Sequence, residues 1–198
     1  MKRVKVGLTG GYASGKSVAS KFFEELGAYI IDLDEVSKRE GLLTDNAKEA
    51  IAETFGEDIF IAGDKLDRAK LQQMIFDSDQ KRVKLESILH PLIIEAAYKE
   101  RAQVKDKIVI IVAALIIESG IVDDLDILIA VIADKNLRAA RGAKRDGITT
   151  DFARRIDDTQ STDQVRIESA DYILYNNGSL DDLRAEVAQV WDEISNLP

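Results

Sequence analysis

Near the start of the chain, Gly10, Gly15, Lys16 and Ser17 complete the pattern G-x-x-x-x-G-K-[ST]. An apolar run typical of a buried strand precedes this pattern, and apolar residues at helical spacing follow it. A strand, a glycine-rich turn and a helix start bind phosphate well, because glycines let backbone N–H groups approach the anion and the helix N-terminus adds a positive end. The pattern therefore predicts a nucleoside triphosphate site, and an ordinary tight turn that matches by chance is the alternative.

The same motif predicts which residues contact the nucleotide. Lys16 is expected to reach the β- and γ-phosphates, and the Ser17 hydroxyl is expected to help hold Mg²⁺, the cofactor that accompanies ATP. The ATP-binding residues predicted in this segment are Gly11, Ala13, Ser14, Gly15, Lys16, Ser17 and Val18.

The composition argues against several other classes of protein. The chain has 198 residues, which fits a single domain, and its formal net charge of −9 argues against a nucleic-acid partner. It contains no cysteine and a single histidine, His90, which excludes disulfides, thiolate metal sites and multi-histidine metal centres. No apolar run approaches the roughly 20 residues of a membrane span. We therefore expect a cytoplasmic protein without a membrane partner.

Two carboxylates follow the second expected strand. Residues 28–31 have the pattern of a strand that runs on into Asp32 and Asp34. Because residues i and i+2 of an extended strand share a face, both carboxylates would point the same way at the carboxyl end of the sheet, where ligands of α/β proteins bind. This placement predicts a catalytic or Mg²⁺-positioning role. The alternative is a solvated loop end in which Asp34 caps the helix that follows.

Residues 35–105 have the pattern of a largely helical block without a strong strand. Asp67 is the expected N-cap of one helix, residues 56–65 are expected to form an irregular turn, and His90-Pro91 is expected to interrupt a later helix. Because the block is longer than the usual connection between strands, we predict that it packs as a helical substrate-binding subdomain.

Two later apolar runs, residues 107–117 and 125–132, predict buried parallel strands. A last short strand is expected at 170–174, and Ser179 with Asp182 is expected to start the helix that closes the domain. These strands and the two near the N-terminus predict a mainly parallel sheet.

A basic helix is predicted between the last two strands, with Asp134 as its N-cap and Thr150 as the N-cap of the next helix. Arg138, Arg141 and Arg145 fall at i, i+3 and i+7, which is one face of a helix. In so acidic a chain, a basic face near a triphosphate site indicates a lid whose guanidinium groups hold phosphates. A solvated face paired with neighbouring carboxylates is the alternative for each single arginine.

Several of these segments, in this order and spacing, resemble the dephospho-CoA kinase family over nearly the full length of the chain. The residues that carry the resemblance are 7–17 (GLTGGYASGKS), 30–34 (IIDLD), 66–68 (LDR), 89–93 (LHPLI), 115–120 (LIIESG), Arg141 with Arg145, Arg155 with Gln160, 170–171 (AD) and 176–178 (NNG). The resemblance implies that ATP phosphorylates the ribose 3′-hydroxyl of dephospho-CoA, which gives coenzyme A and ADP in the last step of coenzyme A biosynthesis.

The resemblance also implies roles for individual residues. Asp34 resembles the base that accepts the hydroxyl proton, and Arg141 resembles the lid arginine on the ATP phosphates. The turn that contains Asn177 lies where the family holds adenine. The residues expected on the acceptor side are Asp34, Arg68, His90, Pro91 and Glu118.

The expected fold is therefore the three-layer α/β fold of P-loop NTPases, with a mainly parallel five-stranded sheet, an inserted helical substrate subdomain and a helical lid. Its core is expected at about 1–34, 106–135 and 170–198. The acceptor-binding part is expected at about 35–105 and the lid at about 136–168.

Three residues depart from the family pattern: Ala114 stands at a common proline, Arg138 at a frequent glutamine, and Tyr12 at a smaller aliphatic residue. None of them removes a phosphate-binding or proton-transfer group. Two other functions remain as alternatives, a different small-molecule P-loop kinase, such as a nucleoside or nucleotide monophosphate kinase, and a nucleotide switch that binds ATP without transferring phosphate.

Overall fold

The computed structural model describes residues 4–61, 65–76 and 78–197. The chain divides into two compact units. Met1–Asp32 and Arg101–Pro198 form the first, called here the sheet unit, and Leu33–Glu100 forms the second, called here the helical unit.

The sheet unit is built on a parallel sheet. Within the described residues this sheet has five strands in the order β2-β5-β1-β6-β7. The strands are β1 (Lys5–Gly10), β2 (Tyr29–Asp32), β5 (Val109–Val112), β6 (Ile127–Ile132) and β7 (Tyr172–Tyr175). Every neighbouring pair is parallel, with Lys5 opposite Val109 and Val6 opposite Ile127 on the two sides of β1. The predicted sheet is confirmed, and the glycine-rich loop leaves its middle strand.

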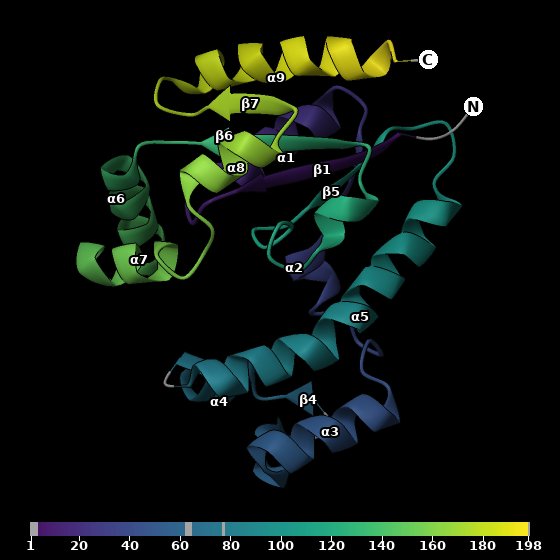
Figure 1. Cartoon of the computed structure of the whole chain (residues 1–198), viewed down its shortest axis with the longest axis vertical. Helices are drawn as coiled ribbons and strands as arrows, with labels where there is room; N and C mark the ends of the chain where they lie inside the picture. The colour runs from purple at the N-terminus through teal and green to yellow at the C-terminus, as the bar shows by residue number, and fades with distance from the viewer. Residues whose placement is uncertain (1–3, 62–64, 77, 198) are drawn as a thin grey trace. The chain divides into compact units, whose positions relative to one another are not determined.

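Helices cover both faces of the sheet. On one face α1 (Lys16–Glu25) and α9 (Leu180–Ser195) pack against each other and against alternate residues of the strands, including Val6, Leu8 and Ile129. The short helix α8 (Asp163–Ser169) packs on β6 and β1, and Figure 1 shows it on the side of the sheet opposite to α1. This arrangement confirms the three-layer fold.

Two helices and one short turn complete the sheet unit. α6 (Lys135–Asp146) and α7 (Thr150–Asp157) pack on each other, and η2 (Ile121–Asp124) precedes β6. Asp134 caps α6, as predicted, because its carboxylate accepts the N–H groups of the first turn. The predicted cap of α7 is wrong by one residue. Thr149 is extended and its hydroxyl accepts the N–H of Phe152, so Thr150 lies inside the helix.

The apolar run at 107–117 is a strand over only part of its length. β5 ends at Val112, and the backbone then turns, with Ser119 N bonded to Leu115 O at 2.9 Å. The apolar residues after Val112 lie outside the strand and contribute side chains to the core. Ile116 is fully buried and lies near Gly7 of β1. The run of apolar residues therefore correctly predicted a buried segment, but the strand is shorter than predicted.

The helical unit has its own core, in which Ile51, Phe55, Ile59, Leu71 and Leu85 pack together. Its elements are α2 (Leu33–Val36), α3 (Asp45–Phe55), η1 (Glu57–Ile59), β3 (Phe60–Ile61), β4 (Lys65–Leu66), α4 (Arg68–Phe76) and α5 (Asp79–Gln103), whose end runs past the unit.

Two predictions for this unit have different outcomes. Asp67 caps α4, since its carboxylate accepts the N–H of Lys70 at 3.0 Å. The turn expected at 56–65 is instead a 3-10 turn followed by the antiparallel pair β3-β4, with Phe60 opposite Leu66. Residues 62–64 of that segment lie outside the described residues.

The interruption predicted at His90-Pro91 is wrong, because α5 continues through Pro91. A proline inside a helix costs about 3 kcal/mol, since it removes one backbone hydrogen bond and crowds the preceding turn. Leu85 before the proline and Ile93 and Ala97 after it are all buried. Packing on both sides of Pro91 offsets its cost.

Candidate active site

The loop between β1 and α1 has the backbone that a phosphate site needs. Gly15 has φ 106°, a left-handed conformation that favours glycine, and it is the N-cap of α1. Ser14 N donates to Gly11 O at 3.1 Å and closes the turn. The first turn of α1 consists of Lys16, Ser17 and Val18. It carries no carboxylate that would oppose an anion at the helix N-terminus.

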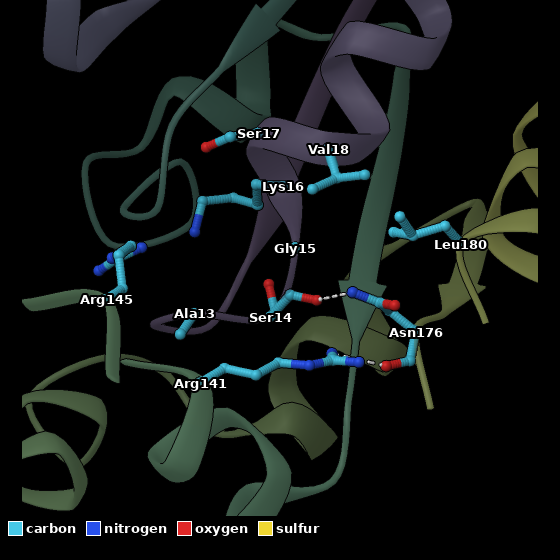
Figure 2. A pocket seen from close by; sticks show the side chains of 10 residues that line it. All are labelled: Ala13, Ser14, Gly15, Lys16, Ser17, Val18, Arg141, Arg145, Asn176 and Leu180. Carbon is cyan, nitrogen blue, oxygen red and sulfur yellow. Dashed lines mark hydrogen bonds between the residues drawn. The ribbon is translucent and has the colours of Figure 1, made fainter. Parts of the chain in front are cut away.

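A cavity of about 300 Å³ opens at this loop. Figure 2 shows the ten residues that line it: Ala13, Ser14, Gly15, Lys16, Ser17, Val18, Arg141, Arg145, Asn176 and Leu180. Six of the seven loop residues predicted to bind ATP therefore lie in one cavity together with Arg141. Gly11 lies behind it, where its carbonyl oxygen accepts a hydrogen bond from Lys16. Three cationic side chains and a helix N-terminus make this cavity suited to a polyphosphate.

Lys16 is held above the loop by backbone oxygens. Its Nζ donates to Gly10 O at 2.7 Å and to Gly11 O at 3.2 Å, and the side chain is half-buried. These bonds keep the ammonium group at the cavity that the loop surrounds. The lysine of the motif therefore lies at this cavity, and its role on the phosphates stays a prediction.

Asn176 ties three distant segments together at the cavity. Its side-chain Nδ2 donates to Ser14 O at 2.8 Å, and its backbone carbonyl oxygen accepts from Arg141 Nη1 at 2.9 Å, as Figure 2 shows. The residue predicted at this turn is Asn177 instead. Asn177 lies outside the lining residues, and its Oδ1 accepts the N–H of Asp134 at 2.7 Å. Asn176 directly follows β7 and is buried, whereas Asn177 is exposed, and the sequence pattern alone does not show this difference.

The predicted basic face of α6 divides into different environments. Arg141 and Arg145 line the cavity, whereas Arg138 is buried and pairs with Asp157 at 2.8 Å and with Asp163 at 2.6 Å. Arg138 therefore supports the structure and does not hold phosphate, which corrects that part of the lid prediction.

Arg145 has two partners at the edge of the cavity. Its Nε and Nη2 donate to the Asp146 carboxylate at 2.7 and 2.8 Å, and its guanidinium lies 5.1 Å from the centre of the Tyr12 ring. Tyr12 also donates its hydroxyl to Asp146. The hydrogen bonds from Arg145 and then from Tyr12 lower the pKa of Asp146 to about 2.

The prediction that an extended strand continues to Asp34 is wrong. β2 ends at Asp32, and Leu33–Val36 forms the short helix α2, because Leu33 and Val36 are both buried while Asp34 and Glu35 face solvent. Asp32 and Asp34 are therefore not related by strand alternation. Asp34 lies exposed in the first turn of α2, where its carbonyl oxygen accepts the Ser37 hydroxyl at 2.7 Å.

The residues predicted on the acceptor side lie in different units. Arg68, His90 and Pro91 belong to the helical unit, as does Asp34, and Glu118 belongs to the sheet unit. Arg68 Nη2 donates to Ser37 O at 2.5 Å, and Glu118 Oε1 accepts the N–H of Ser161 at 2.6 Å. The predicted roles of these residues stay predictions.

The helical unit contains a second cavity, of about 600 Å³. Its lining includes the side chains of Lys38, Arg39, Lys48, Lys65 and Arg68, with Glu40 as the one carboxylate among the lining residues. Apolar side chains complete it: Leu42, Leu43, Ile61, Leu66 and Leu89. Five of the lining residues are cations and one is an anion, and four of the cations pair with carboxylates: Lys38 with Glu35, Arg39 with Glu100, Lys48 with Asp45 and Lys65 with Glu40.

Two further observations concern the described ranges 4–61, 65–76 and 78–197. They contain no group of three or more His, Asp or Glu side chains that could hold a metal ion. None of their helices combines the length and the apolar character that crossing a bilayer requires.

The parallel sheet, the loop between its middle strand and α1, and the cationic cavity at that loop define a P-loop kinase. The family model for dephospho-CoA kinase matches residues 4–182. A dephospho-CoA kinase from Fusobacterium nucleatum is 36% identical over 190 residues, covering 96% of this chain and 97% of that protein. The chain belongs to the dephospho-CoA kinase family, which uses ATP to phosphorylate dephospho-CoA in the final step of coenzyme A biosynthesis.

Solved structures agree with this assignment. The structure of a dephospho-CoA kinase from Campylobacter jejuni has a TM-score of 0.69 and 26% identity, covering 96% of both chains. A crystal structure from Thermus thermophilus has a TM-score of 0.82 and 25% identity, covering 98% of this chain and 99% of that one. The resemblance drawn from the sequence is thus confirmed.

Proposed function

We propose that the cavity at the glycine-rich loop holds the triphosphate of ATP and that the enzyme transfers the γ-phosphoryl group to the ribose 3′-hydroxyl of dephospho-CoA. A bond forms between the 3′-oxygen and the γ-phosphorus, and the bond between that phosphorus and the β–γ bridging oxygen breaks. The products are coenzyme A and ADP. The main support is the cavity itself, in which Lys16, Arg141 and the N-terminus of α1 converge on one space.

On the donor side, Lys16 and Arg141 neutralise the phosphates, and the N–H groups of the loop orient them. Leu180 and the turn at 176–178 hold the adenine, which fits an exposed apolar side chain at the cavity. Asn177 contributes to this turn through its backbone.

Mg²⁺ accompanies ATP in this proposal. Ser17 is exposed and lines the cavity, and a hydroxyl oxygen is a donor that Mg²⁺ accepts. The bound ion neutralises charge on the β- and γ-phosphates. The protein contributes the Ser17 hydroxyl as a ligand.

Asp34 is the proposed base. Its carboxylate is exposed in the first turn of α2, directly after the strand β2, and it accepts the proton of the 3′-hydroxyl as the new bond to phosphorus forms. Phosphoryl transfer needs positioning and charge neutralisation more than covalent catalysis, so a single carboxylate is a sufficient base.

The cavity of the helical unit is the proposed acceptor pocket. Its lysine and arginine side chains suit the diphosphate of dephospho-CoA, and its leucine and isoleucine side chains suit the pantetheine arm. Arg68 lines this cavity, and His90, Pro91 and Glu118 are proposed as further acceptor-side residues. We also propose that the enzyme acts in the cytoplasm and has ATP and dephospho-CoA as its partners, without a nucleic acid.

An ADP-release assay tests this function. The enzyme is given ATP, Mg²⁺ and one acceptor, either dephospho-CoA, adenosine, AMP or CMP, with Lys16→Ala as the control for contaminating kinases. Turnover that requires dephospho-CoA supports the proposal, and removal of Mg²⁺ by a chelator should abolish it. Turnover with a nucleotide instead would identify another small-molecule kinase, and tight ATP binding without turnover on any acceptor would identify a nucleotide switch.

A further inference from the structure

Tyr12 lies within the glycine-rich loop, but its side chain packs on α6 rather than lining the cavity. The ring fits there because residue 142 of α6 is a glycine. A Cβ on Gly142 would overlap the Tyr12 ring and approach its hydroxyl oxygen to 2.9 Å. The loop and α6 therefore meet in a contact that leaves no room for a side chain at position 142.

The Tyr12 side chain supports Arg145 in two ways. The guanidinium of Arg145 lies over the Tyr12 ring, 5.1 Å from the ring centre. The Tyr12 hydroxyl donates to Asp146, which accepts two hydrogen bonds from the same guanidinium. Arg145 is otherwise an exposed side chain, with 58% of its surface accessible. An exposed arginine samples many rotamers, so these three contacts restrict a group that would otherwise be mobile.

Arg145 lines the cavity at the loop together with Lys16 and Arg141. Asp146 uses two of the five N–H donors of the guanidinium, so three more can serve a phosphate. Asp146 itself is an anion at the edge of the cavity and would repel a triphosphate. Its bonds to Arg145 and Tyr12 reduce that repulsion. The three residues together carry no net charge, and they present the remaining guanidinium N–H donors of Arg145 to the nucleotide.

We propose that Tyr12 is a positioning residue that holds Arg145 at the phosphate cavity before the nucleotide arrives. This inference rests on the proposed function of that cavity as the ATP site. Because the guanidinium is already ordered, nucleotide binding loses less side-chain freedom. Tyr12 acts through Arg145 and touches neither the acceptor nor the reacting atoms.

The test compares Tyr12→Leu, Tyr12→Phe and Arg145→Met by the KM for ATP, the KM for dephospho-CoA, kcat, and the Kd of a fluorescent ATP analogue. Tyr12→Leu should raise the Kd and the KM for ATP about tenfold, the size expected for a weakened hydrogen bond to a charged group. Tyr12→Phe keeps the ring and should show a smaller rise. The KM for dephospho-CoA should not change.

A matched control exists on α9. Arg184 is also stacked on an aromatic ring, Phe22 at 4.1 Å, and is paired with a carboxylate, Glu25 at 2.5 Å, but it does not line the cavity. Arg184→Met should leave the affinity for ATP unchanged. An equal loss in this control would contradict the proposal, because it would show a general effect on stability.

The double variant Tyr12→Leu/Arg145→Met gives the sharpest outcome. If Tyr12 acts through Arg145, the double variant binds the analogue no more weakly than Arg145→Met alone. Additive losses, or unchanged ATP affinity in Tyr12→Leu, would overturn the inference. Gly142→Ala displaces the Tyr12 ring without changing residue 12, so it should raise the Kd for the analogue as Tyr12→Leu does. This variant tests the inference if Tyr12→Leu does not fold. Binding of the analogue is measured without acceptor, so a failure of the proposed reaction is distinguishable from a failure of this inference.

Discussion

Arg138 Nη2 lies 2.8 Å from Asp157 Oδ2, in an ion pair whose side chains keep only 4% and 7% of their exposure. Arg138 also pairs with Asp163. Both members of the pair lie against Gly11, because a Cβ at that position would meet the Arg138 guanidinium and would lie 3.0 Å from Asp157 Oδ1. The glycine-rich loop therefore packs on a buried charge pair between α6 and α7.

Removing one partner of this pair should destabilise the fold strongly. Arg138→Met leaves the buried Asp157 carboxylate without this ion-pair partner, which typically costs about 3–5 kcal/mol in the free energy of unfolding. Asp157→Leu should cost less, because Arg138 keeps its ion pair with Asp163. The double variant, which removes both charges, should recover much of this loss. Denaturant unfolding measures all three. A loss in the double variant equal to the sum of the two single losses would mean that Arg138 does not depend on this partner.

Asp34→Asn should lower kcat by roughly a hundredfold or more while the Kd for ATP stays nearly unchanged, because the variant loses the proposed base and keeps the phosphate site. Glu35→Gln is a suitable control, since Glu35 is the neighbouring exposed carboxylate of α2 and pairs with Lys38 at 2.6 Å. Steady-state kinetics and ATP binding distinguish the possibilities. Parallel loss of binding and turnover in Asp34→Asn would indicate a metal or structural role.

Arg68→Met should raise the KM for dephospho-CoA about tenfold, the effect of losing one charge-assisted hydrogen bond to a phosphate. The KM for ATP should remain as it is. Lys70→Met tests the specificity of this effect, because Lys70 is on the same helix, lies outside the cavity and pairs with Asp58. Similar changes in both variants would argue against the proposed acceptor pocket.

The carboxyl group of Asp146 should titrate with a pKa of about 2, below its ordinary value of 3.8, because Arg145 and Tyr12 donate hydrogen bonds to its ionised form. A lowered folded-state pKa stabilises the fold above the ordinary value, and this contribution is lost as the pH falls from about 4 to about 2. Carbon-detected NMR of the carboxyl group measures the midpoint. Arg145→Met should move it upward and Arg184→Met should not. An unshifted midpoint in Arg145→Met would assign the effect to another group.

The geometry of the glycine-rich loop was predictable because local sequence determines it. The glycines and the apolar residues of the loop segment specify a strand, a turn and a helix, and Lys16 and Ser17 follow at fixed spacing. The five-stranded sheet followed from the same kind of signal, since buried parallel strands leave nearly continuous apolar runs such as Ile127–Ile132.

The errors occurred where tertiary packing overrides local preference. Ala113 to Ile117 has the composition of a strand but turns away to cover the sheet, and Pro91 is retained inside a helix by burial on both sides. The chain forms a helical turn at Asp34, because this turn buries both Leu33 and Val36. Arg138 and Asp157 are 19 residues apart, so no spacing rule connects them.

Asn176 and Ser14, which meet through the 2.8 Å hydrogen bond from Nδ2 to the backbone oxygen, are 162 residues apart. A growing chain therefore exposes the complete glycine-rich motif long before it contains the asparagine that anchors the loop and accepts Arg141. The order of synthesis delays the assembly of the cavity at the glycine-rich loop until β7 has joined the edge of the sheet. A partly made chain carries the motif but lacks Asn176, so under the proposed function ATP binding is expected to report completed folding during translation.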